Sequence, residues 1–360
     1  MSADYLDQPQ AVRPGEEVDP ARLAAYLHGA IPDLHGELTI EQYPQGYSNL
    51  TYLLRLGERE LVLRRPPFGS EGGTAHDMAR EYGILRALAP VYARVPQPLA
   101  YCNDETVIGA PFFVMARVPG VILRAQPPAG LDTSPAVMAR LAEAALANLA
   151  SIHALPLDTL DLPFKPSPGG YVARQVEGWT RRYAQARTDD IPELERSAAW
   201  LAAHLPPDGA ATLIHNDYKH DNLVLDPADL PTIRAVLDWE MATVGDPLMD
   251  LGTTLGYWVE AGDPPALQAL RFGPTTLPGN PGRAALVAHY AAASGCDVSN
   301  IVFYYVFGLF KIAGIAQQIY ARYRRGHSHD PRFAGLIHAI RALGQTATLA
   351  IDQDRLDNLS

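Results

Sequence analysis

The most informative stretch of this 360-residue sequence is LIHNDYKHDNLVLDPADLPTIRAVLDWEMATVGDPLMDLG, residues 213–252. In it, Asp217 is followed five residues later by Asn222, and two apolar runs separated by a turn then lead to Asp238. This pattern predicts a loop that carries a carboxylate and an amide, followed by a hairpin that presents a second carboxylate. Phosphoryl transfer uses such a set, because a carboxylate orients the attacking hydroxyl group and hard oxygen atoms bind Mg²⁺.

Taken alone, the Asp-x4-Asn spacing is a weak signal, since an Asx-rich turn with solvated carboxylates has the same pattern. The position of Asp238, after a hairpin and at the end of an apolar run, makes the combination more specific. The eleven histidines of the chain show no comparable metal-ligand spacing. The carboxylates and the amide are therefore the first candidates for a functional site.

The same stretch resembles a known family. HNDYKHDN (215–222) and VLDWE (236–240) are similar to the catalytic and metal-binding loops of the aminoglycoside phosphotransferase family, and GDPLMDL (245–251) fits that family's GDPxxDL signature. The similarity covers roughly residues 35–325. It implies an α+β, protein-kinase-like fold with two lobes, a small β-rich N-terminal lobe and a large helical C-terminal lobe.

The resemblance implies roles for residues of this sequence. Asp217 would be the catalytic base and His215 would brace its loop, while Asn222 and Asp238 would hold Mg²⁺. Asp250 would cap the backbone of the catalytic loop rather than contact the substrate. The implied cofactors are Mg²⁺ and ATP, with GTP as the alternative nucleotide.

The first part of the chain predicts strands at 37–43, 51–56 and 60–65, with a turn at Gly57-Glu58, and a helix over 75–88. Between the first two strands lies QGYSN, in which Gly46, Ser48 and Asn49 are suited to cover phosphate groups. A simple hairpin turn is the alternative for this segment. Further strands are expected within 95–104 and 111–118.

Two adjacent arginines follow the apolar run LVL at 61–63. Kinases carry a lysine at the position of Arg64, and the helix over 75–88 offers Glu81 as its partner. Strand alternation places only one of Arg64 and Arg65 inward, and we assign Arg64 to the phosphates. The alternative is a surface ion pair that contributes almost nothing. Met115 and Ala116 would form the hinge whose backbone meets the purine.

The rest of the chain predicts helices, beginning with the Ala- and Leu-rich run 135–153. We divide the chain into an N-terminal arm and helix (1–33), a nucleotide-binding lobe (34–116) and a helical lobe with the acceptor site (117–360). The Pro- and Gly-rich segment 262–283 is expected to be a connector or a lid. His153 on the Ala-rich helix is expected to be a hydrogen-bonded core histidine.

Composition excludes several classes of protein. A formal net charge of -11 argues against a nucleic-acid partner, and two cysteines are too few for a disulfide scaffold. The apolar run 301–319 contains Lys311, so we interpret it as a core helix and not as a membrane span, and we expect Lys311 to have an anionic partner. No basic stretch followed by an apolar run begins the sequence, which predicts a cytoplasmic protein. No protein partner is evident.

A second resemblance narrows the class of molecule whose hydroxyl group would accept the phosphoryl group. Five runs together are similar to the phosphotransferase domains associated with acyl-CoA dehydrogenases: SNLTYLL (48–54), LVLRRPP (61–67), AREYGILRAL (79–88), GGYVARQVEGWTRRY (169–183) and FYYVFGLFKIAGIAQQIYAR (303–322). This branch implies a small-molecule hydroxyl substrate such as a hydroxyacyl-CoA. Residues from 255 onward carry a net charge of +2, which suits an anionic acceptor, although cations at a helix C-terminus need no ligand.

Two alternatives remain at this point. One is a kinase of an aminoglycoside, of choline or of a homoserine-like alcohol. The other is a catalytically silent nucleotide-binding module, suggested by Arg64 and by the weak glycine loop. The sequence DWE at 238–240 in place of Asp-Phe-Gly, with no Ala-Pro-Glu segment after it, argues against a protein kinase.

Overall fold

The computed structural model describes residues 6–44, 49–68, 77–165, 169–328 and 330–359. The chain forms two compact units. The first consists of Met1–Ile122, Asp158–Lys165 and Asn222–Ala242, and the second of Leu123–Leu157, Pro166–Asp221 and Thr243–Ser360. The first unit is built on a sheet and the second mainly on helices. The division at 33/34 and 116/117 stays a prediction.

The first unit contains a five-stranded antiparallel sheet in the order β1-β2-β3-β5-β4. Its strands are β1 (Leu38–Gln42), β2 (Leu50–Leu56), β3 (Arg59–Arg65), β4 (Pro98–Cys102) and β5 (Phe112–Ala116). β2 and β3 are joined by the tight turn at Gly57-Glu58, and Leu53 pairs with Val62 across the ladder. The predicted hairpin and all five strands are therefore confirmed.

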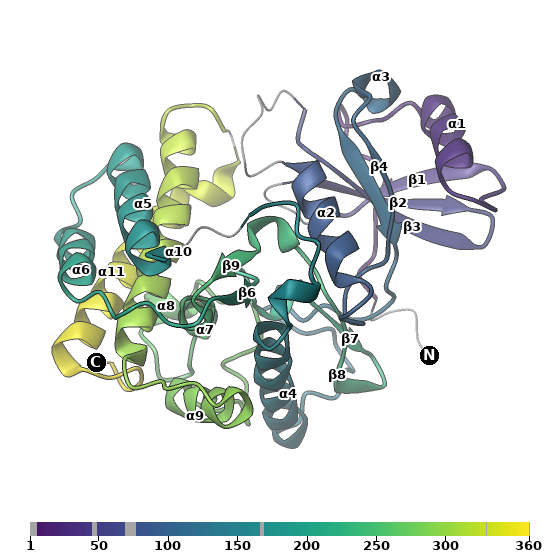
Figure 1. Ribbon diagram of the computed structural model, residues 1–360. Helices are drawn as coiled ribbons and strands as arrows, with labels where there is room; N and C mark the ends of the chain where they lie inside the picture. The colour runs from purple at the N-terminus through teal and green to yellow at the C-terminus, as the bar shows by residue number, and fades with distance from the viewer. Residues whose placement is uncertain (1–5, 45–48, 69–76, 166–168, 329, 360) are drawn as a thin grey trace. The chain divides into compact units, whose positions relative to one another are not determined.

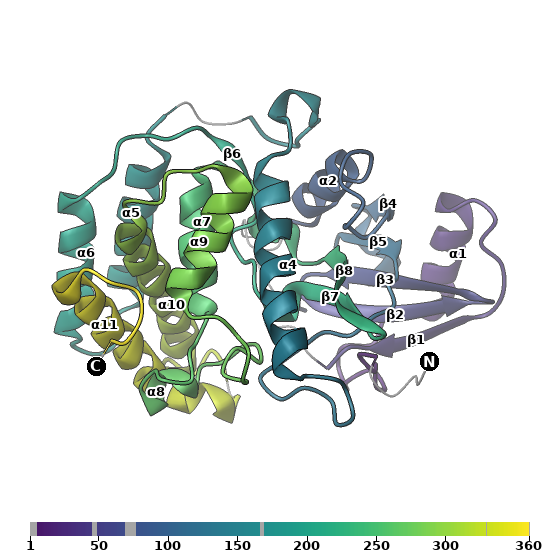
Figure 2. The same ribbon diagram turned by 90° about the horizontal axis from the view of Figure 1, so that it is seen from below.

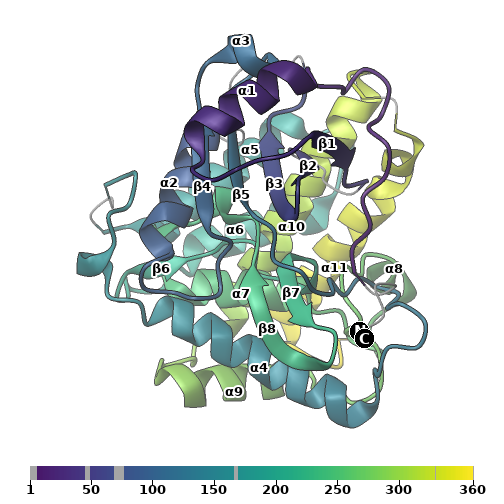
Figure 3. The same cartoon turned by 90° about the vertical axis from the view of Figure 1, so that its right-hand side faces the viewer.

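Helices cover both faces of this sheet (Figure 1). α1 (Pro20–Ala30) and the short α3 (Glu105–Ile108) pack on one face, where Leu23 and Leu27 join the apolar cluster of the strands. Figure 3 shows α1 lying across that face. α2 (Met78–Leu88) packs against β4 and β5 from the other side. Each helix begins at an aspartate N-cap, and α3 is a helix that the sequence analysis did not predict.

A second hairpin completes the first unit. It consists of β7 (Leu223–Asp226) and β8 (Asp229–Val236), followed by the turn η5 (Trp239–Met241). The backbone of Val121, just after β5, forms two hydrogen bonds with Leu225. Gly120 permits this approach, because a Cβ atom there would come within 2.6 Å of the Leu225 carbonyl oxygen.

The second unit contains the remaining helices (Figure 2). These are α4 (Pro135–His153), α5 (Tyr171–Ala186), α6 (Pro192–Ala203), α7 (Pro247–Tyr257), α8 (Pro265–Gln268), α9 (Arg283–Ser294), α10 (Ile301–Arg324) and α11 (Leu336–Gln353). A two-stranded sheet of β6 (Thr212–Ile214) and β9 (Thr243–Gly245) accompanies them. The 3₁₀ turn η6 (Pro331–Gly335) also lies in this unit, whereas η3 (Leu157–Thr159) and η4 (His220–Asn222) occur where the chain passes between the two units.

α10 is the central helix of the second unit and contacts α5, α6, α7 and α11. α7 and α10 meet at Gly252 and Gly308, where a Cβ on either glycine would lie 2.1 Å from a carbonyl oxygen of the other helix. Among the described residues, α10 is the helix whose length and composition would suit a membrane span. Most of its apolar stretch is buried, which confirms the prediction of a core helix.

The 262–283 segment is a connector anchored at both ends. The Arg283 side chain is buried and donates hydrogen bonds to the carbonyl oxygens of Trp258 and Leu356, at 2.9 and 3.0 Å, and also pairs with Asp263. Midway, the Thr275 hydroxyl donates to the Val259 carbonyl oxygen over 2.6 Å. These internal partners anchor the segment to the second unit.

Candidate active site

In the first unit, three carboxylates surround the guanidinium group of Arg64. Nη1 lies 3.4 Å from Glu81 Oε1, and Nη2 lies 2.9 Å from Asp238 Oδ1 and 3.6 Å from Glu240 Oε2. Burial disfavours the charged form of Arg64, but the three carboxylates outweigh burial and raise its pKa. Burial also raises the pKa of Glu81, although Arg64 opposes this shift. Arg64 is thus a permanent cation held beside Asp238.

Glu240 is a member of this group that the sequence analysis did not identify. Its Oε2 accepts a hydrogen bond from Asn49 Nδ2 over 2.7 Å, and its backbone carbonyl accepts from Arg80 Nη1 over 2.8 Å. The only sequence signal for Glu240 is its place two residues after Asp238. Gly46 and Ser48, which were predicted to cover phosphates together with Asn49, lie outside the described residues.

Arg65 lies on the opposite face of the sheet from Arg64. It is buried, donates hydrogen bonds to the carbonyl oxygens of Pro66 and Ile108, and places its guanidinium carbon 3.6 Å from the ring centroid of Phe68. The expectation that only one of the two arginines points inward is wrong, because helices cover both faces of the sheet. Of the two, Arg64 is the one beside Asp238.

Met115 and Ala116 end β5, where the hinge was predicted. Met115 is buried and pairs with Val62 of β3. The Ala116 N–H donates to the Gln97 carbonyl oxygen over 2.9 Å, and the Arg117 N–H donates to the Glu60 backbone carbonyl oxygen over 3.2 Å. Both N–H groups are therefore engaged within the first unit, and the assignment of Met115 and Ala116 as a purine-binding hinge stays a prediction.

Asn222 and Asp238 both belong to the first unit. The Leu237 N–H donates to the Asn222 carbonyl oxygen over 2.8 Å, which keeps Asn222 beside the residue that precedes Asp238. Asp238 has φ of 66°, a conformation that few residues other than glycine, asparagine and aspartate adopt readily. One amide and one carboxylate fit Mg²⁺, which keeps waters and phosphate oxygens as its other ligands. No cluster of three or more His, Cys, Asp or Glu within the described ranges is arranged to enclose a metal ion.

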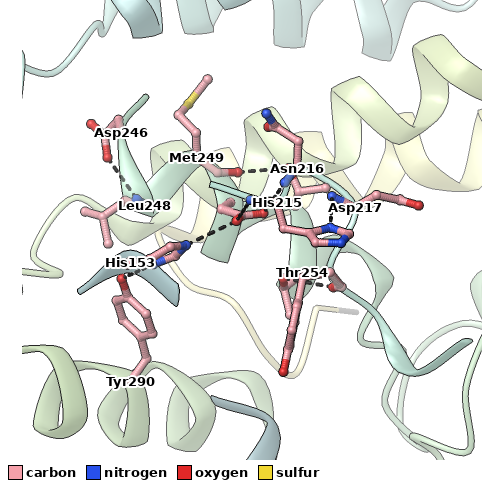
Figure 4. Close-up of polar contacts among 12 residues, drawn as sticks. His153, His215, Asn216, Asp217, Asp246, Leu248, Met249, Thr254 and Tyr290 are labelled. Atoms are coloured by element: carbon pink, nitrogen blue, oxygen red, sulfur yellow. Dashed lines mark hydrogen bonds and ion pairs between the residues drawn. The ribbon is translucent and has the colours of Figure 1, made fainter. Parts of the chain in front are cut away.

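In the second unit, the catalytic loop predicted at His215-Asn216-Asp217 is held by Asp250. The two carboxylate oxygens of Asp250 accept hydrogen bonds from the N–H groups of His215, at 2.6 Å, and Asn216, at 2.8 Å. The Asp217 N–H donates to His215 Nδ1 over 3.2 Å, as Figure 4 shows. The prediction that Asp250 caps the loop is confirmed, and the His215 ring lies where it stabilises the loop.

A buried chain of polar contacts continues from Asp250 to α9. His153 Nε2 lies 3.1 Å from Asp250 Oδ2, and His153 Nδ1 lies 2.6 Å from the Tyr290 hydroxyl (Figure 4). Burial acts to raise the pKa of Asp250, but the hydrogen bond and charge of His153 and the bond from His215 outweigh it and lower this pKa. His153 is a hydrogen-bonded core histidine, as predicted, and it orients the carboxylate that holds the loop.

Lys311 of α10 reaches the same loop. Its Nζ donates to the backbone oxygen of Asn216 over 2.7 Å and lies 3.3 Å from the side-chain oxygen of that residue. Asn216 has φ of 68°, so its carbonyl oxygen is directed by a left-handed backbone. Burial lowers the pKa of Lys311 to about 8. The anionic partner expected for Lys311 is thus replaced by carbonyl and amide oxygens.

Asp217 forms an ion pair with Lys219, two residues further along the loop. The Lys219 ammonium group also lies 3.8 Å from Asp221 Oδ1 and 5.0 and 5.7 Å from the ring centroids of Tyr257 and Phe272. Sequence reasoning missed Lys219, although a cation two residues from a predicted catalytic carboxylate was a usable signal. The contacts with Tyr257 and Phe272 have no such signal, because they join distant parts of the chain.

The sequence-predicted residues are therefore grouped in two sets. The first unit brings together Asn49, Arg64, Glu81 and Asp238, with Asn222 adjacent in the hairpin. The second unit brings together His215 and Asp217 with their supporting residues. The sets are linked by the short segment between Asp217 and Asn222.

Comparisons with known proteins show the family to which the chain belongs. Residues 39–286 match the phosphotransferase enzyme family. Human acyl-CoA dehydrogenase family member 11 is 34% identical over 342 residues, which are 93% of this chain and 43% of that protein. Mouse acyl-CoA dehydrogenase family member 10 is 35% identical over 85% of this chain and 28% of that protein. The chain thus spans less than half the length of these two relatives.

Solved structures give the same fold. A crystal structure from Ralstonia eutropha, whose name places it among the aminoglycoside phosphotransferases, has a TM-score of 0.78 and 28% identity over 94% of this chain and 99% of that chain. Choline kinase from Cryptosporidium parvum has a TM-score of 0.64 at 11% identity, over 93% and 97% of the two chains, and shows the fold alone. The predicted α+β, protein-kinase-like fold is confirmed.

The family match covers more than half of the chain and includes both sets of site residues. The protein therefore belongs to the phosphotransferase enzyme family.

Proposed function

We propose that this phosphotransferase moves the γ-phosphoryl group of ATP to the hydroxyl group of a hydroxyacyl-CoA or of a closely related metabolite. The observation that carries the assignment is the loop around Asp217. Asp250 holds two of its N–H groups and Lys311 holds one of its carbonyl oxygens, so the loop backbone is fixed before any substrate binds. A carboxylate on a fixed loop suits a reaction that depends mainly on positioning and charge neutralisation.

In the proposed step, Asp217 accepts the hydroxyl proton while the acceptor oxygen forms a bond to the γ-phosphorus atom. The bond between that phosphorus and the β–γ bridging oxygen breaks, and ADP leaves with the bonding electron pair. Lys219, paired with Asp217 in this structure, supplies positive charge next to the transferring group. The product is a phosphate ester of the acceptor.

The first unit would bind the nucleotide. Arg64 is a permanent cation whose planar fork suits two phosphate oxygens at once, and Glu81 and Glu240 hold it in place. Asn222 and Asp238 would hold Mg²⁺, which when bound neutralises negative charge on the phosphates. ATP is the proposed donor, with GTP as the alternative nucleotide.

The acceptor class rests on two observations. Relatives that match nearly the whole of this chain are named as acyl-CoA dehydrogenase family members. Their name refers to acyl-CoA substrates, and a hydroxyacyl-CoA is chemically close to an acyl-CoA. In addition, Lys219 and Lys311 reach the loop that carries Asp217, and Arg182 of α5 stacks on Trp179, which itself contacts α10 at Gly314. Such cations favour an anionic CoA ester over a polycationic aminoglycoside.

The proposal is tested by incubating the enzyme with Mg-ATP and a panel of acceptors, and by looking for products heavier by one phosphoryl group with mass spectrometry. The panel contains hydroxyacyl-CoAs with the hydroxyl at several positions, the matching acyl-CoAs without a hydroxyl, an aminoglycoside, choline and homoserine. We expect product only from hydroxyacyl-CoAs. Product from another alcohol alone would retain the kinase and discard the CoA ester, and bound ATP with no product anywhere would favour a silent nucleotide-binding module.

A further inference from the structure

The segment Arg271–Thr275, in the connector between α8 and α9, lies against the catalytic loop of the second unit. The Phe272 ring lies edge-on to the Tyr257 ring, with the two ring centroids 5.3 Å apart. The Lys219 ammonium group lies 5.7 Å from the centroid of the Phe272 ring. Gly273 packs on His220 so closely that a Cβ there would come within 2.8 Å of the imidazole side chain. These contacts fix the residue before them, Arg271, next to the loop that carries Asp217.

Arg271 differs from the other arginine of this connector. The Arg283 guanidinium group is fully buried and is bound by the carbonyl oxygens of Trp258 and Leu356 and by the carboxylates of Asp263 and Glu260. The Arg271 side chain is partly buried, its Nε is inaccessible to solvent, and it has no hydrogen-bond or ion-pair partner among the described residues. Keeping a guanidinium N–H away from water without an acceptor is costly.

Such an arrangement has no stabilising role within the chain. An arginine that only filled space would keep its charge in solvent, as Arg322 and Arg341 do on the exposed surfaces of α10 and α11. Arg271 is instead followed by Phe272 and Gly273, which lie against Lys219 and His220 of the loop that carries Asp217. A guanidinium N–H that is shielded from water without an acceptor, close to a catalytic loop, is the arrangement expected where a ligand supplies the missing acceptor.

The charges around the loop point to the sign of that ligand. Lys219 lies on the loop itself and pairs with Asp217, and Lys311 reaches the loop from α10. Arg182 has the Trp179 ring as its neighbour and no carboxylate partner within the described part of the chain. Burial is the main cause of the lowered pKa of Lys311; Asp250 and Asp217 act to raise this pKa, and Lys219 and Arg182 act to lower it, so all four charges belong to its electrostatic environment. Arg271 has no carboxylate partner among the described residues, so its positive charge would attract an anionic ligand and repel a cationic one.

We propose that Arg271 determines acceptor specificity by binding an anionic group of the acceptor, either a phosphate of CoA or the carboxylate of a free hydroxy acid. This inference rests on the proposed function, since it names a residue that recognises the same acceptor. A guanidinium group binds phosphate or carboxylate through two parallel hydrogen bonds, which adds orientation to affinity. Arg271 would thereby direct the acceptor hydroxyl toward Asp217.

The test compares wild type, Arg271→Gln, Arg271→Lys and the control Arg341→Gln, an exposed arginine on α11. Their KM values are measured for a hydroxyacyl-CoA, for the free hydroxy acid, for an uncharged thioester of the same acid and for Mg-ATP. We expect Arg271→Gln to raise KM about 10- to 100-fold for one anionic acceptor, with partial recovery in Arg271→Lys. The acceptor that responds, CoA ester or free acid, identifies the anionic group. KM for the uncharged thioester and for Mg-ATP should stay unchanged.

A binding measurement without turnover separates this inference from the proposed function. By calorimetry, wild type should bind CoA or the free hydroxy acid, and Arg271→Gln should bind it about 10- to 100-fold more weakly at unchanged or higher thermal stability. A wild type that binds one of these anions but phosphorylates no CoA ester would overturn the proposed function and leave Arg271 as an anion site. An Arg271→Gln variant that is unchanged toward both anions, weakened equally toward the uncharged thioester, or weakened toward Mg-ATP would overturn the assignment of Arg271.

Discussion

Lys311, a buried lysine in the centre of the longest helix, donates a 2.7 Å hydrogen bond to the backbone carbonyl oxygen of Asn216. Asn216 lies between His215 and Asp217 in a left-handed conformation. The core of the second unit is therefore tied directly to the loop that carries the proposed base. The Asp250 carboxylate accepts hydrogen bonds from the N–H groups of His215 and Asn216 in the same loop. The loop is therefore held by an anion at its N–H groups and by a cation at a carbonyl oxygen.

Replacing Lys311 with methionine should reduce kcat about 10- to 100-fold while leaving KM for the acceptor within about threefold. The reason is that the Asn216 carbonyl would lose its donor and Asp217 would shift, and a displacement of about 1 Å costs about this much. Gln318→Met on the same helix is the matched control, because Gln318 bonds only within its own helix, to Gly314, in the described structure. Steady-state kinetics on both variants checks this, and a Lys311→Met enzyme with wild-type kcat would contradict it.

The stability conferred at Lys311 should depend on pH. Its pKa is about 8 in the folded protein and near 10.5 when unfolded, so between these values the unfolded chain binds more protons. The free energy of unfolding of wild type, relative to Lys311→Met, should therefore rise as the pH increases from about 8 toward 10.5. Burial is the main cause, and Asp250, Asp217, Lys219 and Arg182 are the charges that modify it. Denaturant unfolding at several pH values checks this; a flat or falling difference would refute it.

Asp250→Asn should impair both stability and turnover. The substitution removes the charge of a fully buried group that accepts two backbone hydrogen bonds and contacts His153, and a hydrogen bond to a charged group contributes roughly 1.5–3 kcal/mol. Because folding lowers the pKa of Asp250 from 3.8, its stabilisation is present above about pH 4 and is lost as the pH falls through the folded pKa. The stability difference from wild type should thus shrink in acid. A difference that persists unchanged at low pH would contradict this account.

The neighbouring arginines of β3 should respond differently to the same change. Arg64→Gln removes the cation beside Asp238 and should raise KM for Mg-ATP about 10-fold or more. Arg65→Gln removes a buried guanidinium group that bonds Ile108 and covers Phe68, so it should lower the thermal midpoint and leave KM for Mg-ATP unchanged. Kinetics and thermal unfolding on the pair separate the two roles. Equal effects of the two substitutions on KM would argue against the assignment of Arg64.

Local patterns were sufficient to predict much of the fold. The hairpin at Gly57-Glu58 follows from two alternating runs around a turn, and α4 has both predicted bounds because Pro135 begins it and its apolar periodicity extends to His153. Asp217, Asn222 and Asp238 were found because they occur within one short stretch. The resemblance then supplied roles that spacing alone does not give.

The features that could not be predicted from the sequence depend on contacts between residues far apart in the chain. Asn49 and Glu240 are 191 residues apart, and no local pattern predicts their hydrogen bond. The burial of Arg65 requires knowledge that α1 and α3 cover the second face of the sheet, which a single strand does not reveal. The partner of Lys311 was predicted to be an anion because charge was the only criterion available from sequence, whereas the folded chain offers a carbonyl oxygen directed by Asn216.

The central claim is that Asp217 accepts the acceptor proton in phosphoryl transfer, and single-turnover kinetics tests it most directly. Wild type, Asp217→Asn and the control Asp226→Asn, whose carboxylate pairs with Arg234 on the β7–β8 hairpin, are loaded with Mg-ATP and mixed with a hydroxyacyl-CoA. We predict that Asp217→Asn binds ATP as wild type does but forms the phosphate ester about 10²- to 10⁴-fold more slowly, while Asp226→Asn stays near the wild-type rate. An Asp217→Asn enzyme that transfers the phosphoryl group at the wild-type rate would contradict the account.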